Sequence, residues 1–278
     1  MRLFLLVALT MTAFASNSLL NRVGVANYGM DPFDFAVIRT GAGAAMLWGL
    51  VVIRSQAKPN LFAAKRIGGA LALGIYMIGF SWAYLTLDAG LGALILFGVL
   101  QVVVFGWAVI SGQPIPIFRW IGAVIALIGL AVLLWPTGSA AVPVLGALAM
   151  VAAGVAWAAY TLLGRAEADP LGATATNFLL CLPLVALTLL VGGDHSISLV
   201  GAATAILAGA ITSGLGYALW YRVLPELPTT LAGIAQLSVP VIAVAGGVIL
   251  LGEEMTIRLL LAGALVLGGI AISLITRR

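Results

Sequence analysis

Long apolar stretches fill most of the chain, and short polar or turn-forming breaks separate them. A helix needs about 20 apolar residues to cross the hydrocarbon core of a bilayer, so each stretch predicts one membrane span. The pattern predicts ten spans, over residues 3–20, 33–53, 67–87, 91–110, 118–135, 144–163, 171–191, 200–221, 229–251 and 257–275. Most breaks contain Pro, Gly or charged residues, and none is long enough to form a second domain.

The positions of Lys and Arg predict the orientation, because the cytoplasmic ends of membrane spans are enriched in both residues. With the N-terminus in the cytoplasm, most of them fall inside: Arg2, Arg54, Lys58, Lys65, Arg66, Arg119, Arg165, Arg222, Arg277 and Arg278. Arg22 falls outside, with Arg39 and Arg258 at the outer ends of spans, and most acidic residues are also outside. One missed span would scramble this bias, so it favours ten spans with both termini inside.

The first stretch also allows a second interpretation. Arg2, an apolar run and Ala13-Phe14-Ala15 resemble a signal peptide with its cleavage site. An internal repeat favours a retained helix instead, because the chain matches itself at an offset of about 140 residues. At that offset Asp31-Pro32 falls on Asp169-Pro170, residues 98–102 fall on 237–241, and residues 14–22 fall on 157–165. The first span therefore has a counterpart in the sixth.

The repeat predicts two units, residues 1–138 and residues 139–278. Each unit has five spans, and because five is odd the second unit enters the membrane upside down relative to the first. Inverted repeats recur in secondary transporters, where the substrate binds at the repeat interface near the bilayer midplane. The predicted fold class is therefore an all-α integral membrane protein, with ten transmembrane helices in two inverted five-helix repeats.

Composition narrows the function further. Hydrophobic residues make up 63% of the chain and charged residues only 8%, whereas a soluble protein has roughly 25% charged residues. This excludes a soluble enzyme, a nucleic-acid binder and a disordered protein; the basic residues behind the pI of 9.6 are scattered in short loops. One cysteine, Cys181, and one histidine, His195, argue against a disulfide framework and a metal centre, and we expect no cofactor.

Three segments carry a resemblance to a known family. They are Leu237–Val241, the run from Leu251-Gly252-Glu253 to Gly263 and Gly269, and the run from Pro32-Phe33 to Arg39. In order and spacing they resemble the EamA-like branch of the drug/metabolite transporter superfamily. The resemblance implies ten helices and the transport, usually export, of metabolites, amino acids or drugs. The first repeat departs from the family pattern, with Gln101 in place of a common proline and Gln113 in place of a common glutamate.

Polar residues inside spans are candidates for a substrate site, because an unsatisfied polar group in hydrocarbon costs several kcal/mol. The candidates are Asn17, flanked by Ser16 and Ser18, together with Gln101, Asn177 and Gln236. Pro240 frees the main-chain carbonyl of Gln236, so this turn is a candidate substrate contact or pivot. The alternatives are ordinary hydrogen bonds between helices and a tolerated proline kink.

Aromatic residues within the spans are a second group of candidates. Tyr76, Trp157, Tyr160 and Tyr217 can line a pocket for an amphipathic or aromatic metabolite, or offer a cation–π surface. Trp157 and Tyr160 are three residues apart and share one helix face. The alternative is plain packing.

Charged residues supply candidates for gating or coupling: Arg39, Asp88 and Glu253. Arg39 lies about 9 Å into its span at 1.5 Å per residue. It can snorkel to the outer interface, bind an anionic substrate, or close an outer gate against Asp34, Asp88 or Glu253. No carboxylate is predicted near the midplane, so proton coupling, exchange and uniport all stay open. We expect His195 to be solvated in an outer loop.

Together these features favour a secondary transporter of the cytoplasmic membrane. Its partners would be membrane lipid and a small metabolite, such as an amino acid or a related amphipathic compound, which it would export by alternating access around a central cavity. The alternatives are a channel or a non-transporting membrane subunit. A membrane-embedded enzyme acting on lipid is disfavoured, because neither face offers a recognisable set of acid, base or metal-binding residues.

Overall fold

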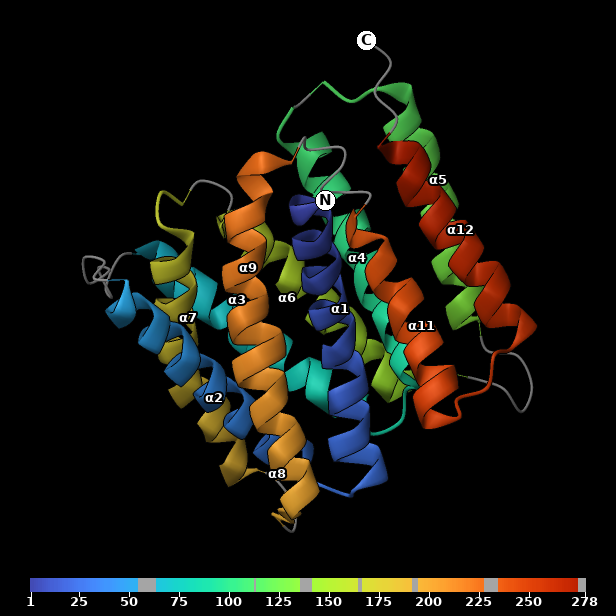
Figure 1. Ribbon diagram of the computed structural model, residues 1–278. Helices are drawn as coiled ribbons and strands as arrows, with labels where there is room; N and C mark the ends of the chain where they lie inside the picture. The colour runs from blue at the N-terminus through green and yellow to red at the C-terminus, as the bar shows by residue number, and fades with distance from the viewer. Residues whose placement is uncertain are drawn as a thin grey trace.

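The computed structural model describes residues 1–54, 64–112, 114–135, 142–164, 167–191, 195–227 and 235–274. These residues form a bundle of helices (Figure 1). The main helices are α1 (Arg2–Arg22), α2 (Pro32–Ile53), α3 (Ala64–Ala83), α4 (Ala89–Ile110), α5 (Ile117–Leu134), α6 (Val144–Gly164), α7 (Pro170–Ala186), α8 (Leu199–Ile206), α9 (Gly216–Val223), α11 (Ser238–Leu251) and α12 (Ile257–Ser273).

The described residues contain eight helical segments that are long and apolar enough to cross a membrane, and two shorter apolar helices, α11 and α12. This confirms a multi-pass helical membrane protein. The predicted span over residues 229–251 is longer than α11, which begins at Ser238; residues 229–234 lie outside the described residues. At 14 residues, α11 is about 21 Å long, which is less than the hydrocarbon thickness of about 30 Å.

Two predicted spans contain π-helical segments that the apolar pattern does not reveal. The first span continues past α1 into η1 (Val23–Asn27). The eighth span is built from α8, the π-helical segment η4 (Leu207–Leu215) and α9, with the 3₁₀ turn η5 (Leu224–Glu226) after it. A further 3₁₀ segment, η3 (Leu187–Leu190), extends α7. π-Helical turns widen a helix locally and often occur at functional sites.

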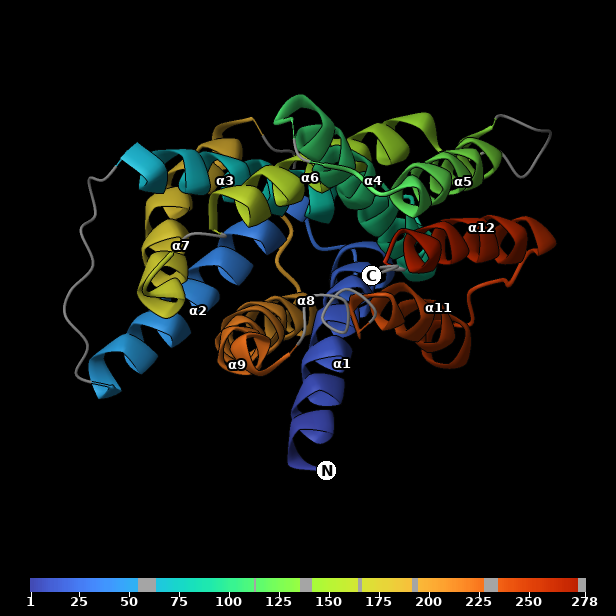
Figure 2. The same ribbon diagram turned by 90° about the horizontal axis from the view of Figure 1, so that it is seen from above.

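Helices from the two halves of the chain pair with one another. α2 contacts α7, α4 contacts α11, and α5 contacts α12. α3 packs against α6 on one side of the bundle, whereas α1 packs against η4, α9 and α11 on the other, as the view from above shows (Figure 2). The largest cluster of buried apolar residues includes Tyr76, Met77 and Phe80 of α3, with Phe178 and Cys181 of α7.

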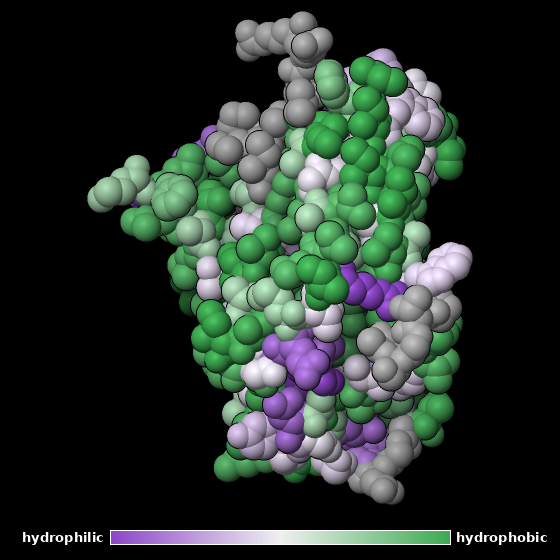
Figure 3. Space-filling model, turned by 90° about the vertical axis from the view of Figure 1, so that its right-hand side faces the viewer, coloured by the Kyte–Doolittle hydropathy of each residue, from purple (hydrophilic) through white to green (hydrophobic). Residues whose placement is uncertain are grey.

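The outward-facing side chains are largely apolar. Trp107 of α4, Leu190 of η3 and Ile249 of α11 are 52%, 83% and 78% exposed. Figure 3 shows one such face, mostly hydrophobic, with hydrophilic residues gathered at about the height of the connection between α11 and α12. A surface of this kind suits contact with lipid, because water would disfavour so much exposed apolar area.

Glycines let α5 and α12 approach closely. A Cβ atom at Gly269 would lie 2.5 Å from the carbonyl oxygen of Gly122 and 2.6 Å from the amide nitrogen of Ala126, whereas a Cβ at Gly268 would meet nothing within 4 Å. We therefore expect Gly269→Ala to lower the free energy of unfolding by about 1–3 kcal/mol, because the two backbones must separate. Thermal unfolding in detergent measures this. Gly268→Ala is the matched control, and equal destabilisation by the two substitutions would contradict the predicted contact.

Candidate functional site

Trp157 of α6 lies at the centre of an aromatic cluster. Its ring centroid is 5.0 Å from that of Tyr76 on α3, 5.5 Å from Tyr160 on α6 and 5.4 Å from Tyr217 on α9, and the last two rings are stacked on it. Phe14 of α1 also contacts Tyr217, at 5.5 Å. Helices from both halves therefore supply the cluster, which offers π faces for apolar or cationic groups.

A chain of polar side chains runs beside this cluster. The Oδ1 atom of Asn17 accepts hydrogen bonds from the hydroxyls of Thr212 at 2.7 Å and Ser213 at 3.2 Å. Nη2 of Arg39 then donates to the hydroxyl of Ser213 at 3.3 Å and to that of Tyr76 at 3.1 Å. Asn17 is only 4% exposed and Arg39 is completely buried. The chain thus joins α1, η4, α2 and α3 through hydrogen bonds inside the bundle.

The π-helical segment η4 positions the middle of this chain. Thr212 and Ser213 are both in η4, and Gly209 of the same segment lies directly against the main-chain carbonyl of Arg39. No side chain would fit at Gly209, because its Cβ would overlap that carbonyl oxygen. Close approach of η4 to α2 therefore depends on this glycine. The close approach brings Ser213 within hydrogen-bond distance of the Arg39 guanidinium.

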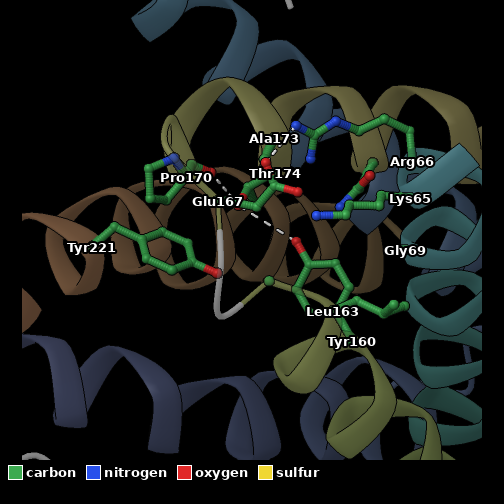
Figure 4. A pocket seen from close by; sticks show the side chains of 12 residues that line it. Lys65, Arg66, Gly69, Tyr160, Leu163, Glu167, Pro170, Ala173, Thr174 and Tyr221 are labelled. Atoms are coloured by element: carbon green, nitrogen blue, oxygen red, sulfur yellow. Dashed lines mark hydrogen bonds and ion pairs between the residues drawn. The ribbon is translucent and has the colours of Figure 1, made fainter. Parts of the chain in front are cut away.

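One end of the bundle, here called the Arg66 end, holds a small cavity of about 10 Å³, room for roughly one water molecule. Residues of α3, α6, α7 and α9 surround it, and Figure 4 shows the side chains of Tyr160, Thr174 and Tyr221 turned toward the same space. Nη2 of Arg66 pairs with Oε2 of Glu167 at 2.7 Å beside it. Asn177 also lines the cavity, and its Oδ1 atom is buried without a hydrogen-bond partner.

The opposite end, here called the Arg22 end, carries an ionic network. Nη2 of Arg22 lies 3.2 Å from Oδ1 of Asp88, and its Nε lies 4.0 Å from Oε1 of Glu253. Glu253 in turn accepts hydrogen bonds from the main-chain amides of Ala89 at 2.7 Å and Gly90 at 3.4 Å. It therefore caps the N-terminus of α4 from another part of the chain, where a negative charge is favourable.

An open hollow of about 400 Å³ lies over the Arg22 network. It is lined by Arg22, Asn27, Asp88, Leu251, Gly252, Glu253, Glu254 and Thr256. Burial raises the pKa of Glu253 above its usual value, and nearby Asp88 adds to this, whereas the amide of Ala89 and the charge of Arg22 oppose it. Glu253 is therefore easier to protonate in this arrangement than it is in water.

The structure brings most of the sequence-predicted site residues to these places. Tyr76, Trp157, Tyr160 and Tyr217 form the aromatic cluster, Asn17 and Arg39 belong to the polar chain, and Asn177 lines the cavity. Asp88 and Glu253 lie together at the Arg22 end. Sequence reasoning could name these side chains but not group them.

Two glutamines and a proline lie elsewhere. Nε2 of Gln101 donates to the hydroxyl of Ser273 at 3.1 Å, which makes it a link between α4 and α12. Gln236 is half-buried in the turn just before α11, and Pro240 is buried in the first turn of that helix. The helix is interrupted at Leu237, between them. Gln113, the other departure from the family pattern, lies outside the described residues.

The structure narrows the alternatives for Arg39 and adds a contact to His195. Arg39 does not snorkel to the interface, and it makes no ion pair with Asp34, Asp88 or Glu253. It is held inside because Tyr76 and Ser213 bind its guanidinium and the ring of Phe80 stacks near it, with 4.9 Å between the guanidinium carbon and the ring centroid. His195 is exposed in a connecting segment, as expected, and its Nδ1 also lies 3.3 Å from Oδ1 of Asp34.

Several residues of these sites were missed by the sequence reasoning. Thr212 and Ser213 are adjacent polar residues in mid-span, and the criterion that selected Asn17 would have found them. Arg22 was used to predict the membrane orientation and was not chosen as a site residue, although it joins α1 to the segment Tyr84–Asp88 and to Glu253. Among the described residues, no group of His, Cys, Asp and Glu is arranged to hold a metal ion.

Comparison with known proteins identifies the family. The profile of the EamA-like transporter family matches residues 144–275. The chain is 44% identical to the uncharacterized protein PA1977 of Pseudomonas aeruginosa, over 99% of this chain and 96% of that protein. It is 31% identical to the threonine/homoserine exporter RhtA of Escherichia coli K12, over 83% of this chain and 76% of RhtA.

A solved structure described as "Crystal structure of protein" has the same fold, with a TM-score of 0.69 over 96% of this chain and 98% of that chain at 21% identity. The family relationship also means that the chain is a membrane transporter and not an enzyme. By its sequence relatives, and in agreement with its apolar helical bundle, this chain belongs to the EamA-like transporter family of the drug/metabolite transporter superfamily.

Proposed function

We propose that this protein exports small amphipathic metabolites, amino acids foremost, across the cytoplasmic membrane by alternating access. The observation that carries the proposal is the buried site where the two halves of the chain meet. Asn17, Arg39 and Tyr76 come from the first half, and Trp157, Ser213 and Tyr217 come from the second. Secondary transporters bind their substrates at such an interface.

The helix contacts support two inverted repeats, residues 1–138 and residues 139–278. With α1 matched to α6, α2 to α7, α3 to the α8–α9 segment, α4 to α11 and α5 to α12, three helices contact their own counterparts: α2, α4 and α5. The contact of α3 with α6 is mirrored by that of α9 with α1, and the contact of α4 with α6 by that of α11 with α1. The family profile also matches a region that begins with α6 and ends just after α12.

The contacts between connecting segments support alternation of the spans. At the Arg22 end, Arg22 meets the α3–α4 connection and Glu253, and the amide of Asp31 donates to the carbonyl of Ser196. At the Arg66 end, Arg66 meets Glu167. These segments fall at two ends, which supports ten crossings. The excess of Lys and Arg favours a cytoplasmic location for the Arg66 end and both termini.

The substrate class is inferred from the site together with the relative RhtA, a threonine/homoserine exporter. Hydrogen-bonding groups and a cation on one side, with aromatic faces on the other, suit a molecule that is small, polar at one end and apolar at the other. The Arg66–Glu167 and Arg22–Asp88 pairs lie at the two ends of the path and can act as inner and outer gates.

Reconstituted proteoliposomes test the proposal. Vesicles loaded with a mixture of amino acids and related metabolites are diluted, and release is followed by mass spectrometry with and without a pH gradient. We expect release of a defined subset that saturates with concentration and is absent from protein-free vesicles. Unsaturable, unselective release would indicate a channel, and no release under any gradient would indicate a non-transporting subunit; both results would overturn the proposal.

A further inference from the structure

Arg39 is an unusual residue for the interior of a membrane protein. It lies two turns into α2, its side chain is completely buried, and it is the largest fully buried side chain of the described residues. A guanidinium stays protonated in proteins. A charged side chain at this depth is expensive, and in membrane proteins it usually marks a functional site.

Among the described residues, no acidic side chain forms an ion pair with Arg39. Only Nη2 has hydrogen-bond partners, the neutral hydroxyls of Tyr76 and Ser213, whereas Nε and Nη1 are buried without any. The acidic side chains that lie within ion-pair distance of a basic group in the described residues face other partners: Asp88 and Glu253 face Arg22, Glu167 faces Arg66, and Asp34 faces His195, which is charged only when protonated. A buried cation with unused donors lacks an anion.

We propose that Arg39 binds the carboxylate of the transported molecule. A guanidinium is matched to oxyanions by the geometry of its N–H groups. One cation, without a second Arg or a Lys in the polar chain, balances one negative charge, which suits a carboxylate better than a doubly charged phosphate. This assignment rests on the proposed function and specifies the substrate class for the same site.

The surroundings of Arg39 indicate where the rest of the molecule would lie. The hydroxyl of Tyr76 is bound to Arg39, and its ring is 5.0 Å from that of Trp157. When Arg39 holds the carboxylate of a bound molecule, the rest of that molecule would lie toward the aromatic faces around Trp157. In an amino acid, this part includes the ammonium group. Entry requires motion of α2 against η4, and the π-helical geometry of η4 supplies a segment able to rearrange.

Binding to the detergent-purified full chain tests the assignment without requiring transport. The probes are L-threonine, L-threonine methyl ester, acetate and sodium chloride. Their binding is measured by the change in tryptophan fluorescence and by the shift in melting temperature. We expect L-threonine to bind roughly 10- to 100-fold more tightly than its ester, the range of a hydrogen-bonded charge. Acetate should compete with L-threonine, and chloride at equal concentration should not.

Arg39→Met should lose the preference for the acid over the ester, whereas Arg119→Met, at an exposed position of α5, should retain it. Arg39→Met should melt no lower than the wild type, because it removes a buried charge that forms no ion pair in the described residues; a purely structural Arg39 would give a lower melting temperature. Equal affinity of the wild type for acid and ester would overturn the assignment, and so would competition by chloride. If the vesicles release nothing while the wild type still prefers the acid, the proposed export fails and the carboxylate site stands.

Discussion

Replacing Trp157 with alanine should lower amino-acid release from proteoliposomes by roughly 10- to 100-fold, equivalent to about 1.4–2.7 kcal/mol. Trp157 is the ring that Tyr76, Tyr160 and Tyr217 all contact, so its loss removes three aromatic contacts at once. Each such pair contributes about 0.5–1.5 kcal/mol beyond area burial. The measurement is the initial release rate at matched protein density in the vesicles.

Trp107→Ala is the matched control, because Trp107 is half-exposed on the outer surface of α4 and belongs to no ring pair found in the described residues. It should transport at close to the wild-type rate. Trp157→Phe should recover part of the activity, since it keeps an aromatic face. Full activity of Trp157→Ala, with normal folding, would remove the aromatic cluster from the substrate path.

Glu253→Gln should hold the Arg22 end closed, as protonation of Glu253 does, and abolish the dependence of transport on pH at that side. The carboxylate of Glu253 holds the amides of Ala89 and Gly90 and lies 4.0 Å from the Nε of Arg22. An amide side chain keeps the shape of the carboxyl without its charge, and burial and the nearby Asp88 disfavour that charge in the closed arrangement. We expect cysteine probes placed near this end to react more slowly in the variant than in the wild type at neutral pH.

The direction of the pH effect follows from the raised pKa of Glu253. In the closed arrangement the carboxyl binds a proton more readily than in an open, solvated one, where its pKa returns toward 4.5. The closed arrangement therefore gains stability as the pH falls from the raised pKa toward 4.5, and this gain is lost as the pH rises above the raised pKa. Acidification of the Arg22 side should accordingly slow transport in the wild type and leave Glu253→Gln unaffected.

The neighbouring Glu254 supplies the control, because its side chain is exposed and lies in the same hollow. Glu254→Gln should keep the wild-type pH profile and the wild-type rate of cysteine labelling. Asp88 also lies against Arg22, so Asp88→Asn should loosen the same end. An unchanged pH profile in Glu253→Gln would show that another group senses the pH.

The sequence could identify the kinds of side chain that form the site, but it could not show which of them meet in space. Mid-span polarity and aromaticity selected Asn17, Tyr76, Trp157 and Tyr217, and all of them lie in the buried site. The same criteria selected Gln101, which links α4 to α12. A one-dimensional pattern gives the depth of a residue in a span, and it does not tell which face of the helix looks toward the centre.

The alternatives for Arg39 could not be decided from the sequence for a related reason. Its distance from the span end allowed its long side chain to reach the interface, and only the packing of α2 against α3 and η4 decided that it turns inward. The π-helical geometry of η4 could not be predicted either, because it changes the hydrogen-bond spacing without changing the apolar composition.

The sequence by itself determined that this chain is a multi-pass helical membrane protein and named its family, because hydropathy over about 20 residues and the motifs around Pro240 and Glu253 are local properties. The tertiary structure alone decided which side chains meet: Arg39 with Tyr76 and Ser213, and Glu253 with the start of α4. Those contacts join residues far apart in the chain. They depend on helix rotation and close packing at glycines such as Gly209, which no local pattern encodes.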